Sequence, residues 1–261
     1  ASGKFHYKSN EANWTKVRKE KPTSFIGYEE LEIKANLIKY NQSEDHYEIV
    51  LDKTPFYAES GGQIGDIGTL SIGDFSFKVE DVQKSGNQFI HFGKVESGSI
   101  QDITVVDAKI NDLHRQQIRR NHTATHLLHQ ALKEILGEHV QQAGSLVSAS
   151  SLRFDLTHYE QISNSQKEEI ETRVNTIILQ NKVVKTEIKS YEQACEEGAI
   201  SLFGEKYEDI VRVVSVPGVS IELCGGTHVN RTGDIGGFKI LSESALAAGI
   251  RRLVAISGDA I

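Results

Sequence analysis

Apolar, β-branched and aromatic residues in the first part of the chain fall in short runs that alternate with polar residues and end at polar or glycine-containing turns. Such runs are typical of β-strands, and their spacing predicts a small antiparallel β-barrel over residues 25–110. Residues 1–24 are polar and lack a hydrophobic period, so we interpret them as a linker or the end of an upstream domain. The predicted strands cover residues 31–40, 46–51, 75–82, 89–95 and 103–110.

The second half of the chain changes to a helical period. Apolar residues spaced by one helical turn predict a long helix over residues 112–136, which Gly137 ends. A capping box at Ser165–Glu168 predicts the start of a second helix that runs to about residue 180, and a similar box at Ser190–Gln193 predicts a short third helix. With strands expected near residues 140–147, 152–156, 183–188, 210–216, 219–223, 235–241 and 249–256, residues 111–261 are predicted to form an α+β core.

Composition narrows the class of protein. Of 261 residues, 38% are hydrophobic and 25% are charged, as in ordinary globular proteins. No run approaches the roughly 18 apolar residues that a membrane-spanning helix needs, and two cysteines do not make a disulfide framework, so a cytoplasmic location is expected. The net charge of −7 argues against nonspecific binding of nucleic acid by the whole surface. The absence of methionine suggests a segment of a longer protein.

Two short motifs carry the residues that are most suited to chemistry. His122 and His126 are four residues apart, so a helix places both imidazoles on one face. Cys224 and His228 have the same spacing, but Gly225 and the glycine after it make this motif a tight loop. Three imidazoles and one thiolate suit a tetrahedral Zn²⁺ site between a helix and a strand end. The simpler alternative is two surface histidines and a buried cysteine that behaves as a small apolar residue.

Other chemistry is less well supported. A zinc metalloprotease would carry a glutamate directly after His122, and here that position is Thr123. The glycine-rich stretch at residues 54–68 lacks the lysine and following helix of a phosphate-binding loop. It is either a hairpin that needs positive φ or, at Gly61 and Gly62, backbone that a ligand approaches closely. Arg119 and Arg120 immediately precede the histidine motif and are candidate phosphate contacts.

Five motifs in order resemble the editing region of alanyl-tRNA synthetases, which is related to free-standing alanyl-tRNA editing proteins and to the threonyl-tRNA synthetase editing domain. The resemblance covers roughly residues 25 to 257 and rests on TPFYAESGGQ (54–63), HTATH (122–126), LFGEKY (202–207), CGGTH (224–228) and TGDIG (232–236). It implies hydrolysis of mischarged Ser-tRNA(Ala) and Gly-tRNA(Ala). Such editing is needed because a pocket for alanine discriminates weakly against molecules that differ by one small group.

The resemblance also implies roles for individual residues. Zn²⁺ would be held by His122, His126, Cys224 and His228. Gln142 would position the substrate or water as a catalytic residue, and Thr125, between the two histidines, would be the second catalytic residue and line the amino-acid pocket. The substrate-binding residues would be Ser145, Gly61, Gly62, Arg119 and Arg120. Thr125 and Ser145 would favour a serine hydroxyl, and the two glycines would pack against the terminal adenosine.

The expected partners are the acceptor end of tRNA(Ala) and the rest of a synthetase, with no membrane. No stretch of this chain is expected to carry an aminoacylation core with its ATP site. Two alternatives remain open. The chain is a free-standing deacylase, or it is a zinc-stabilised module that binds the tRNA acceptor end without activity of its own, because four protein ligands would leave zinc no open position.

Overall fold

The computed structural model describes residues 14–43, 46–200 and 207–261. The chain divides into two compact units. The first comprises the chain up to Glu59 together with Gly65–Asn111, and the second comprises Ser60–Ile64 together with Asp112–Ile261. The segment Ser60–Ile64 therefore groups with the second unit, although it lies inside the range that the sequence assigned to the barrel. Most of the 202–207 motif falls outside the described residues.

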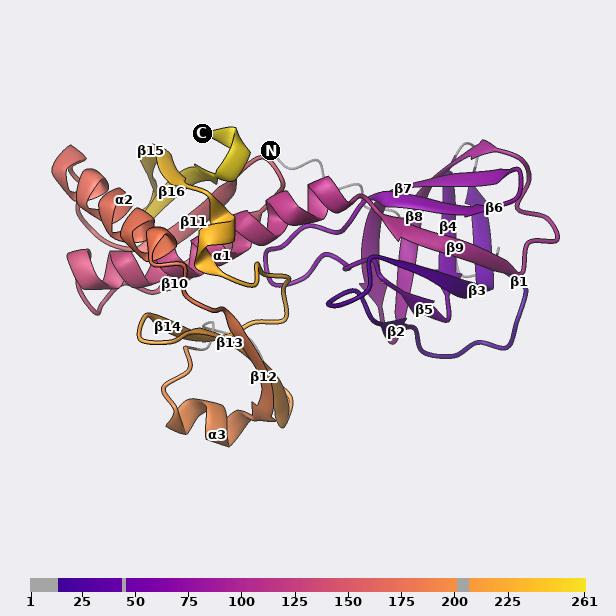
Figure 1. Ribbon diagram of the computed structural model, residues 1–261, viewed down its shortest axis with the longest axis horizontal. Coiled ribbons are helices and arrows are strands. Elements are labelled where there is room, and N and C mark those ends of the chain that lie inside the picture. The colour runs from indigo at the N-terminus through magenta and orange to yellow at the C-terminus, as the bar shows by residue number, and fades with distance from the viewer. Residues whose placement is uncertain (1–13, 44–45, 201–206) are drawn as a thin grey trace. The chain divides into compact units, whose positions relative to one another are not determined.

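The first unit is a closed antiparallel barrel of six strands, drawn in indigo to magenta in Figure 1. The strand order is β3-β4-β8-β7-β6-β9, and β9 pairs back onto β3, which closes the sheet. The barrel predicted from the sequence is confirmed. The strands of this unit are β1 (Thr15–Lys16), β2 (Ser24–Phe25), β3 (Glu32–Ser43), β4 (His46–Leu51), β5 (Lys53–Thr54), β6 (Gly68–Ile72), β7 (Phe75–Ser85), β8 (Gln88–Ser97) and β9 (Val105–Ile110).

Alternating burial along the strands explains why the sequence was informative here. In β7, Phe75, Phe77 and Val79 face the interior, while the residues between them face outward. This is the period of two that a half-buried strand requires. β1 pairs with β3 through Thr15 and Lys16, within the stretch that was interpreted as a linker. β6 was not predicted, because it is a five-residue strand with only two large apolar side chains.

One histidine is sealed inside the barrel. His91 on β8 is fully buried; its Nδ1 donates to the carbonyl oxygen of Ile49 at 2.9 Å, and its Nε2 lies 2.7 Å from the hydroxyl of Thr54. Because a carbonyl oxygen only accepts, Nδ1 carries the proton and Nε2 accepts from the Thr54 hydroxyl. Burial lowers the pKa of His91 from 6.5 to about 4, and the bond to Ile49 offsets only part of that shift.

We expect His91 to make the barrel less stable in mild acid. Between pH 6.5 and about pH 4 the unfolded chain binds a proton that folded His91 does not, so the free energy of unfolding falls as the pH falls through this window. The full shift corresponds to roughly 3 kcal/mol. The single tryptophan, Trp14, packs against the barrel residues Ile38 and Val50, so its fluorescence during urea unfolding reports on this unit.

The matched comparison is His91→Gln against His46→Gln. The first variant should flatten the dependence of unfolding free energy on pH between pH 4 and 6.5. The second should keep it, because His46 lies at the partly exposed start of β4. Equal slopes in the parent and in both variants would show that another group causes the acid sensitivity.

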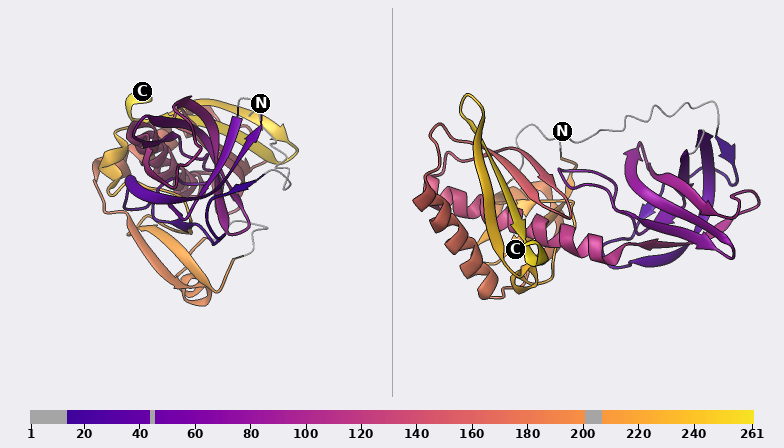
Figure 2. Two further views of the ribbon diagram at one scale, coloured as in Figure 1. Left: turned by 90° about the vertical axis from the view of Figure 1, so that its right-hand side faces the viewer. Right: turned by 90° about the horizontal axis from the view of Figure 1, so that it is seen from above.

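The second unit is an α+β assembly, as the sequence predicted. A four-stranded antiparallel sheet, β10-β11-β16-β15, packs against two long helices, and Figure 2 shows these helices side by side with the β15–β16 hairpin. A second sheet, β12-β13-β14, carries the short helix α3. The elements are α1 (Asp112–Leu136), β10 (Gln142–Val147), β11 (Leu152–Thr157), α2 (Asn164–Leu179), β12 (Lys185–Ser190), α3 (Tyr191–Glu196), β13 (Ile210–Val216), β14 (Ser220–Leu223), η2 (Thr232–Ile235), β15 (Phe238–Ala247), β16 (Ile250–Ser257) and η3 (Gly258–Ala260).

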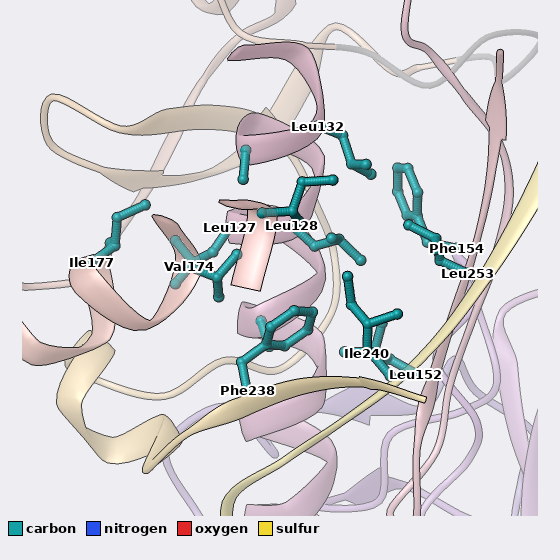
Figure 3. Packing of buried hydrophobic residues seen from close by; sticks show 14 of the residues in the cluster. Leu127, Leu128, Leu132, Leu152, Phe154, Val174, Ile177, Phe238, Ile240 and Leu253 are labelled. Atoms are coloured by element: carbon teal, nitrogen blue, oxygen red, sulfur yellow. The ribbon is translucent and has the colours of Figure 1, made fainter. Parts of the chain in front are cut away.

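The core of this unit lies between the two helices and the four-stranded sheet. Figure 3 shows Leu128 of α1 and Val174 of α2 pointing into the same cluster as Phe154 and Phe238 from the sheet. Helix α1 has the bounds that its hydrophobic stripe predicted. This packing fixes α1, and with it the histidine motif, against the rest of the unit. Among the described residues, no helix combines the length and hydropathy needed to cross a membrane.

The predicted start of α2 was wrong by two residues. Its cap is Ser163, whose hydroxyl accepts from the backbone N–H of Gln166 at 3.2 Å, while the Gln166 side chain accepts from the Ser163 N–H at 2.9 Å. Ser165 therefore lies inside the helix. The sequence offers overlapping boxes at Ser163 and Ser165, and burial of Ile162 immediately before the first one anchors the chain there.

Candidate metal centre

Helix α1 supplies two imidazoles to one buried point. His122 and His126 lie one helical turn apart, and their ring centroids are 5.4 Å apart. Both side chains are about 5% exposed, because the helix is buried on several sides along this segment. The four-residue spacing predicted this shared face. The simpler alternative of two surface histidines does not agree with the structure.

The loop after β14 brings the thiol and the third imidazole to the same point. Cys224 Sγ lies 3.4 Å from His122 Nε2 and 3.3 Å from His228 Nε2. The His228 ring centroid is 4.3 Å from that of His122 and 4.7 Å from that of His126. The four ligand atoms all lie within 4.8 Å of one another. In a tetrahedral zinc site the sulfur and each nitrogen are about 3.5 Å apart, so this donor set fits a metal ion.

Two features shape the loop that carries Cys224. A Cβ atom on Gly226 would lie 2.0 Å from His122 Cε1, so only glycine lets the loop approach this ring. Arg212 on β13 donates from Nη1 to the carbonyl oxygens of Cys224 and Gly226, at 2.8 and 2.9 Å. These two bonds hold the backbone on both sides of the intervening Gly225. Close packing against the imidazole therefore explains the second glycine of the motif, Gly226.

A ring of hydrogen bonds surrounds the donor atoms. Thr123 donates its hydroxyl proton to the Arg119 carbonyl oxygen at 2.9 Å, so its oxygen accepts from His228 Nδ1 at 3.1 Å. Gln63, from the glycine-rich loop, lies 2.7 Å from His122 Nδ1 through its Oε1. In both rings the outer nitrogen is engaged, and Nε2 is the nitrogen directed toward Cys224. Such outer partners orient metal-binding imidazoles.

A buried carboxylate lies behind His126. The Glu222 oxygens lie 3.8 Å from His126 Nδ1 and 3.5 Å from His129 Nδ1, and all three side chains are buried. Burial lowers the pKa of His126, but the negative charges of Glu222 and Cys224 outweigh it and raise that pKa to about 9. Burial raises the pKa of Glu222, and the two imidazoles reverse this effect and lower it overall. The carboxylate thus stabilises positive charge at this end of the site.

The thiol of Cys224 is the negative counterpart within the cluster. Burial raises its pKa, but the imidazoles of His122, His228 and His126 together hold the pKa well below its usual range. Burial and the neighbouring His122 hold the pKa of His228 well below its ordinary value. The arrangement therefore favours a thiolate beside a neutral imidazole, and these are the protonation states in which both groups bind a metal.

The polar residues expected near the substrate lie beside the glycine-rich loop. Gln142 Nε2 donates to Ser145 Oγ at 3.3 Å. A Cβ on Gly62 would lie 2.4 Å from Ser145 Oγ, so the loop backbone packs directly on this serine, while a Cβ on Gly61 would meet nothing within 4 Å. Because Gln63 follows Gly62 and contacts His122, this pair is linked through the loop to one of the candidate metal ligands.

Three other predicted site residues have defined partners. The Thr125 hydroxyl is buried and donates to the Asn121 carbonyl oxygen at 2.8 Å. Arg120 forms an ion pair with Asp259 at 2.6 Å, and the backbone carbonyl of Arg119 receives the Thr123 hydroxyl. A phosphate at Arg120 would therefore compete with a carboxylate.

Four residues around the site were missed at the sequence level: Gln63, Thr123, Arg212 and Glu222. The position of Glu222 two residues before Cys224, at the end of a strand, was a usable signal, because alternate residues of a strand share a face. Gln63 was visible as the polar residue directly after a glycine pair. The sequence alone does not indicate that either one contacts a histidine.

Comparison with known proteins agrees with these motifs. Residues 2–114 match the family model for class II (A) tRNA synthetases, and residues 211–254 match that for the second additional domain of threonyl and alanyl tRNA synthetases. The second match contains Cys224 and His228.

Individual relatives extend the similarity to most of the chain. An alanine–tRNA ligase of Thermoanaerobacter sp. (strain X514) is 50% identical over 245 residues, which cover 90% of this chain and 28% of that protein. Those of Chlorobaculum tepidum and Pseudoalteromonas translucida are 46% and 45% identical and cover 99% and 100% of this chain. The chain spans about 30% of the length of these relatives. It therefore belongs to the alanyl-tRNA synthetase family, as a segment that matches less than a third of its full-length members.

Proposed function

We propose that this chain carries an editing site that hydrolyses the ester of Ser-tRNA(Ala) and Gly-tRNA(Ala). The observation that carries the proposal is the convergence of three imidazoles and a thiol in a chain related to alanine–tRNA ligases. Ser145, which accepts from Gln142, packs on Gly62. The next residue, Gln63, contacts His122. The acceptor end of tRNA(Ala) and the remainder of a synthetase are the proposed partners.

The metal proposed for the site is Zn²⁺. One sulfur and three imidazole nitrogens within 4.8 Å of one another are a donor set that zinc prefers, whereas Mg²⁺ and Ca²⁺ prefer oxygen ligands. The holding residues would be His122, His126, Cys224 and His228. When bound, the ion would supply positive charge that stabilises the negative charge developing on the ester oxygen.

In the proposed reaction, water adds to the ester carbonyl carbon and the bond to the terminal ribose oxygen breaks. The amino acid leaves with its carboxyl group restored, and the ribose oxygen takes the proton from water. Gln142 would position the water or the ester through its amide group. No residue is assigned as a general base. The residues of the chain would act by orienting the ester and the water and by stabilising charge.

Hydrogen-bond directions suggest how serine is selected. The Thr125 hydroxyl already donates to a carbonyl, so its oxygen would accept from the hydroxyl of a bound serine. Ser145 accepts from Gln142, so its own proton would be directed to the substrate. A site that hydrogen-bonds a hydroxyl discriminates strongly against an analogue without it. Alanine, which lacks the hydroxyl, would therefore be spared. These contacts separate serine from alanine only, since glycine has no hydroxyl either, and the proposed hydrolysis of Gly-tRNA(Ala) rests on the relationship to alanine–tRNA ligases.

Single-turnover deacylation with protein in excess tests this function. We expect faster release of serine from Ser-tRNA(Ala) than of alanine from Ala-tRNA(Ala). Gln142→Leu should slow serine release by about 100-fold, the size typical for loss of one positioned hydrogen-bond donor. Gln141→Leu is the matched control, because Gln141 is the neighbouring residue and its side chain is exposed. An ester that survives with the parent protein would contradict the proposal.

A second candidate function is a zinc-stabilised module that binds the tRNA acceptor end. It is favoured by the four protein donors, since a catalytic zinc usually keeps one position for water or substrate. The same experiment separates the two functions. A binding module would protect Ser-tRNA(Ala) from spontaneous hydrolysis, so the ester would last longer with the protein than without it.

A further inference from the structure

Gln63 occupies an unusual position for a residue of a glycine-rich loop. Its side chain is fully buried, and the loop that carries it is fixed to the end of β10. Val147 donates its N–H to the Gly62 carbonyl oxygen at 2.7 Å, and Ile64 donates to the Val147 carbonyl oxygen at 3.1 Å. The backbone on both sides of Gln63 is therefore held on the sheet, and the amide group has a fixed place.

The backbone of Thr227 determines which end of the Gln63 amide faces the metal ligands. The Thr227 N–H lies 2.8 Å from one amide atom of Gln63. Because a backbone N–H only donates, that atom is the oxygen, Oε1. The other end of the amide, Nε2, then donates to the Thr227 hydroxyl at 3.0 Å. Both ends of the amide have a partner, and the reversed orientation would place two donors against each other.

The orientation of the amide in turn determines the tautomer of His122. Oε1 lies 2.7 Å from His122 Nδ1, and an amide oxygen only accepts, so Nδ1 carries a proton. In the neutral ring the lone pair is then on Nε2, which lies 3.4 Å from Cys224 Sγ. The Thr227 N–H thus fixes the orientation of the Gln63 amide, and that amide fixes which nitrogen of His122 carries the lone pair that faces the proposed metal.

We infer that Gln63 is a positioning residue that fixes His122 in the tautomer and ring orientation required for metal binding through Nε2. The inference rests on the metal site proposed above. A second imidazole supports it independently, because Thr123, whose proton is engaged by a carbonyl, fixes His228 in the same way. Gln63 also joins His122 to the loop of Cys224 and His228 through its bonds to Thr227.

Two variants of similar size separate hydrogen bonding from packing. Gln63→Leu fills the space without an acceptor, and Gln63→Glu keeps an oxygen acceptor for the His122 Nδ1 proton. Zinc affinity is measured by competition with a chromophoric chelator, and circular dichroism checks that each variant is folded. We expect Gln63→Leu to bind zinc 10- to 100-fold more weakly, about the range seen when outer partners of metal ligands are removed. Gln63→Glu should stay within about threefold of the parent, because a carboxylate also accepts from imidazole.

The second readout is the tautomer itself, measured on the metal-free protein by long-range ¹H–¹⁵N spectra. We expect His122 of the parent and of Gln63→Glu to carry its proton on Nδ1, and His122 of Gln63→Leu to lose that preference. Parental zinc affinity in Gln63→Leu, or equal losses in both variants, would overturn the inference. If the parent binds no zinc, the proposed metal site fails, and a proton on Nε2 of its His122 would also overturn the role of Gln63.

Discussion

Replacing Cys224 with alanine is expected to remove zinc from the protein and to stop deacylation of Ser-tRNA(Ala). Cys224 is the single sulfur donor of the proposed site, and the neighbouring imidazoles hold its pKa well below the usual range of a thiol, which favours the thiolate. Structural zinc sites bind with about 12 kcal/mol, so the loss of one of four ligands costs roughly 3 kcal/mol, or about 100-fold in affinity. Three imidazoles remain close together, and their mutual repulsion when protonated weakens the site further at low pH.

Zinc content after dialysis against a chelator and single-turnover deacylation are measured on the same samples. The chain offers a matched control in Cys195→Ala, because Cys195 is exposed on α3 and has no place in the metal centre. The thermal midpoint of the parent should rise when zinc is added, and that of Cys224→Ala should rise much less, since binding stabilises only the state that holds the ion. A Cys224→Ala protein that keeps zinc through dialysis would contradict the assignment of this ligand.

The fold was predictable where one periodicity dominated. The barrel strands alternate between interior and exterior, and α1 carries an apolar stripe that ends at a glycine, so both were recognised from the sequence. Local signals failed where two equivalent choices competed. Ser163 and Ser165 can both cap the helix. The helix begins after Ser163 because Ile162 is buried in the core, and that burial is not evident from the sequence.

The four candidate ligands that the structure brings together were predictable because each motif is local, with a four-residue spacing. Their outer partners were not. Gln63 is 59 residues from His122 along the chain, and their contact depends on the register in which the glycine-rich loop meets β10. Glu222 is closer to its motif, but the approach of α1 that brings His126 and His129 to it is a result of tertiary packing.

Alanine substitution at the two adjacent glycines of the CGGTH motif should give opposite results. At Gly226 an added Cβ would lie 2.0 Å from His122 Cε1, 2.4 Å from its Nδ1 and 2.8 Å from Gln63 Oε1. Contacts below 3.0 Å are not tolerated, so the imidazole or the loop must move by about 1 Å. Metal sites accept changes of only about 0.2 Å in ligand distance. Gly226→Ala should therefore lower zinc affinity by about 100-fold or more and cost 1–3 kcal/mol of stability, as overpacking typically does.

At Gly225 the added Cβ would meet nothing within 4 Å, and the backbone there is not in the left-handed region. Gly225→Ala should therefore bind zinc within a few-fold of the parent, since neither ligand geometry nor the Arg212 contacts to the flanking carbonyls need change. The measurement is chelator competition on both variants, with urea unfolding of the zinc-loaded proteins. Equal affinities for the two variants would mean that the loop does not pack on His122, and the proposed set of four donors would have to be abandoned. A loss of zinc affinity confined to Gly226→Ala would instead show that Gly226 is required for the close approach of the loop to His122. The two variants differ only in where the same methyl group is placed.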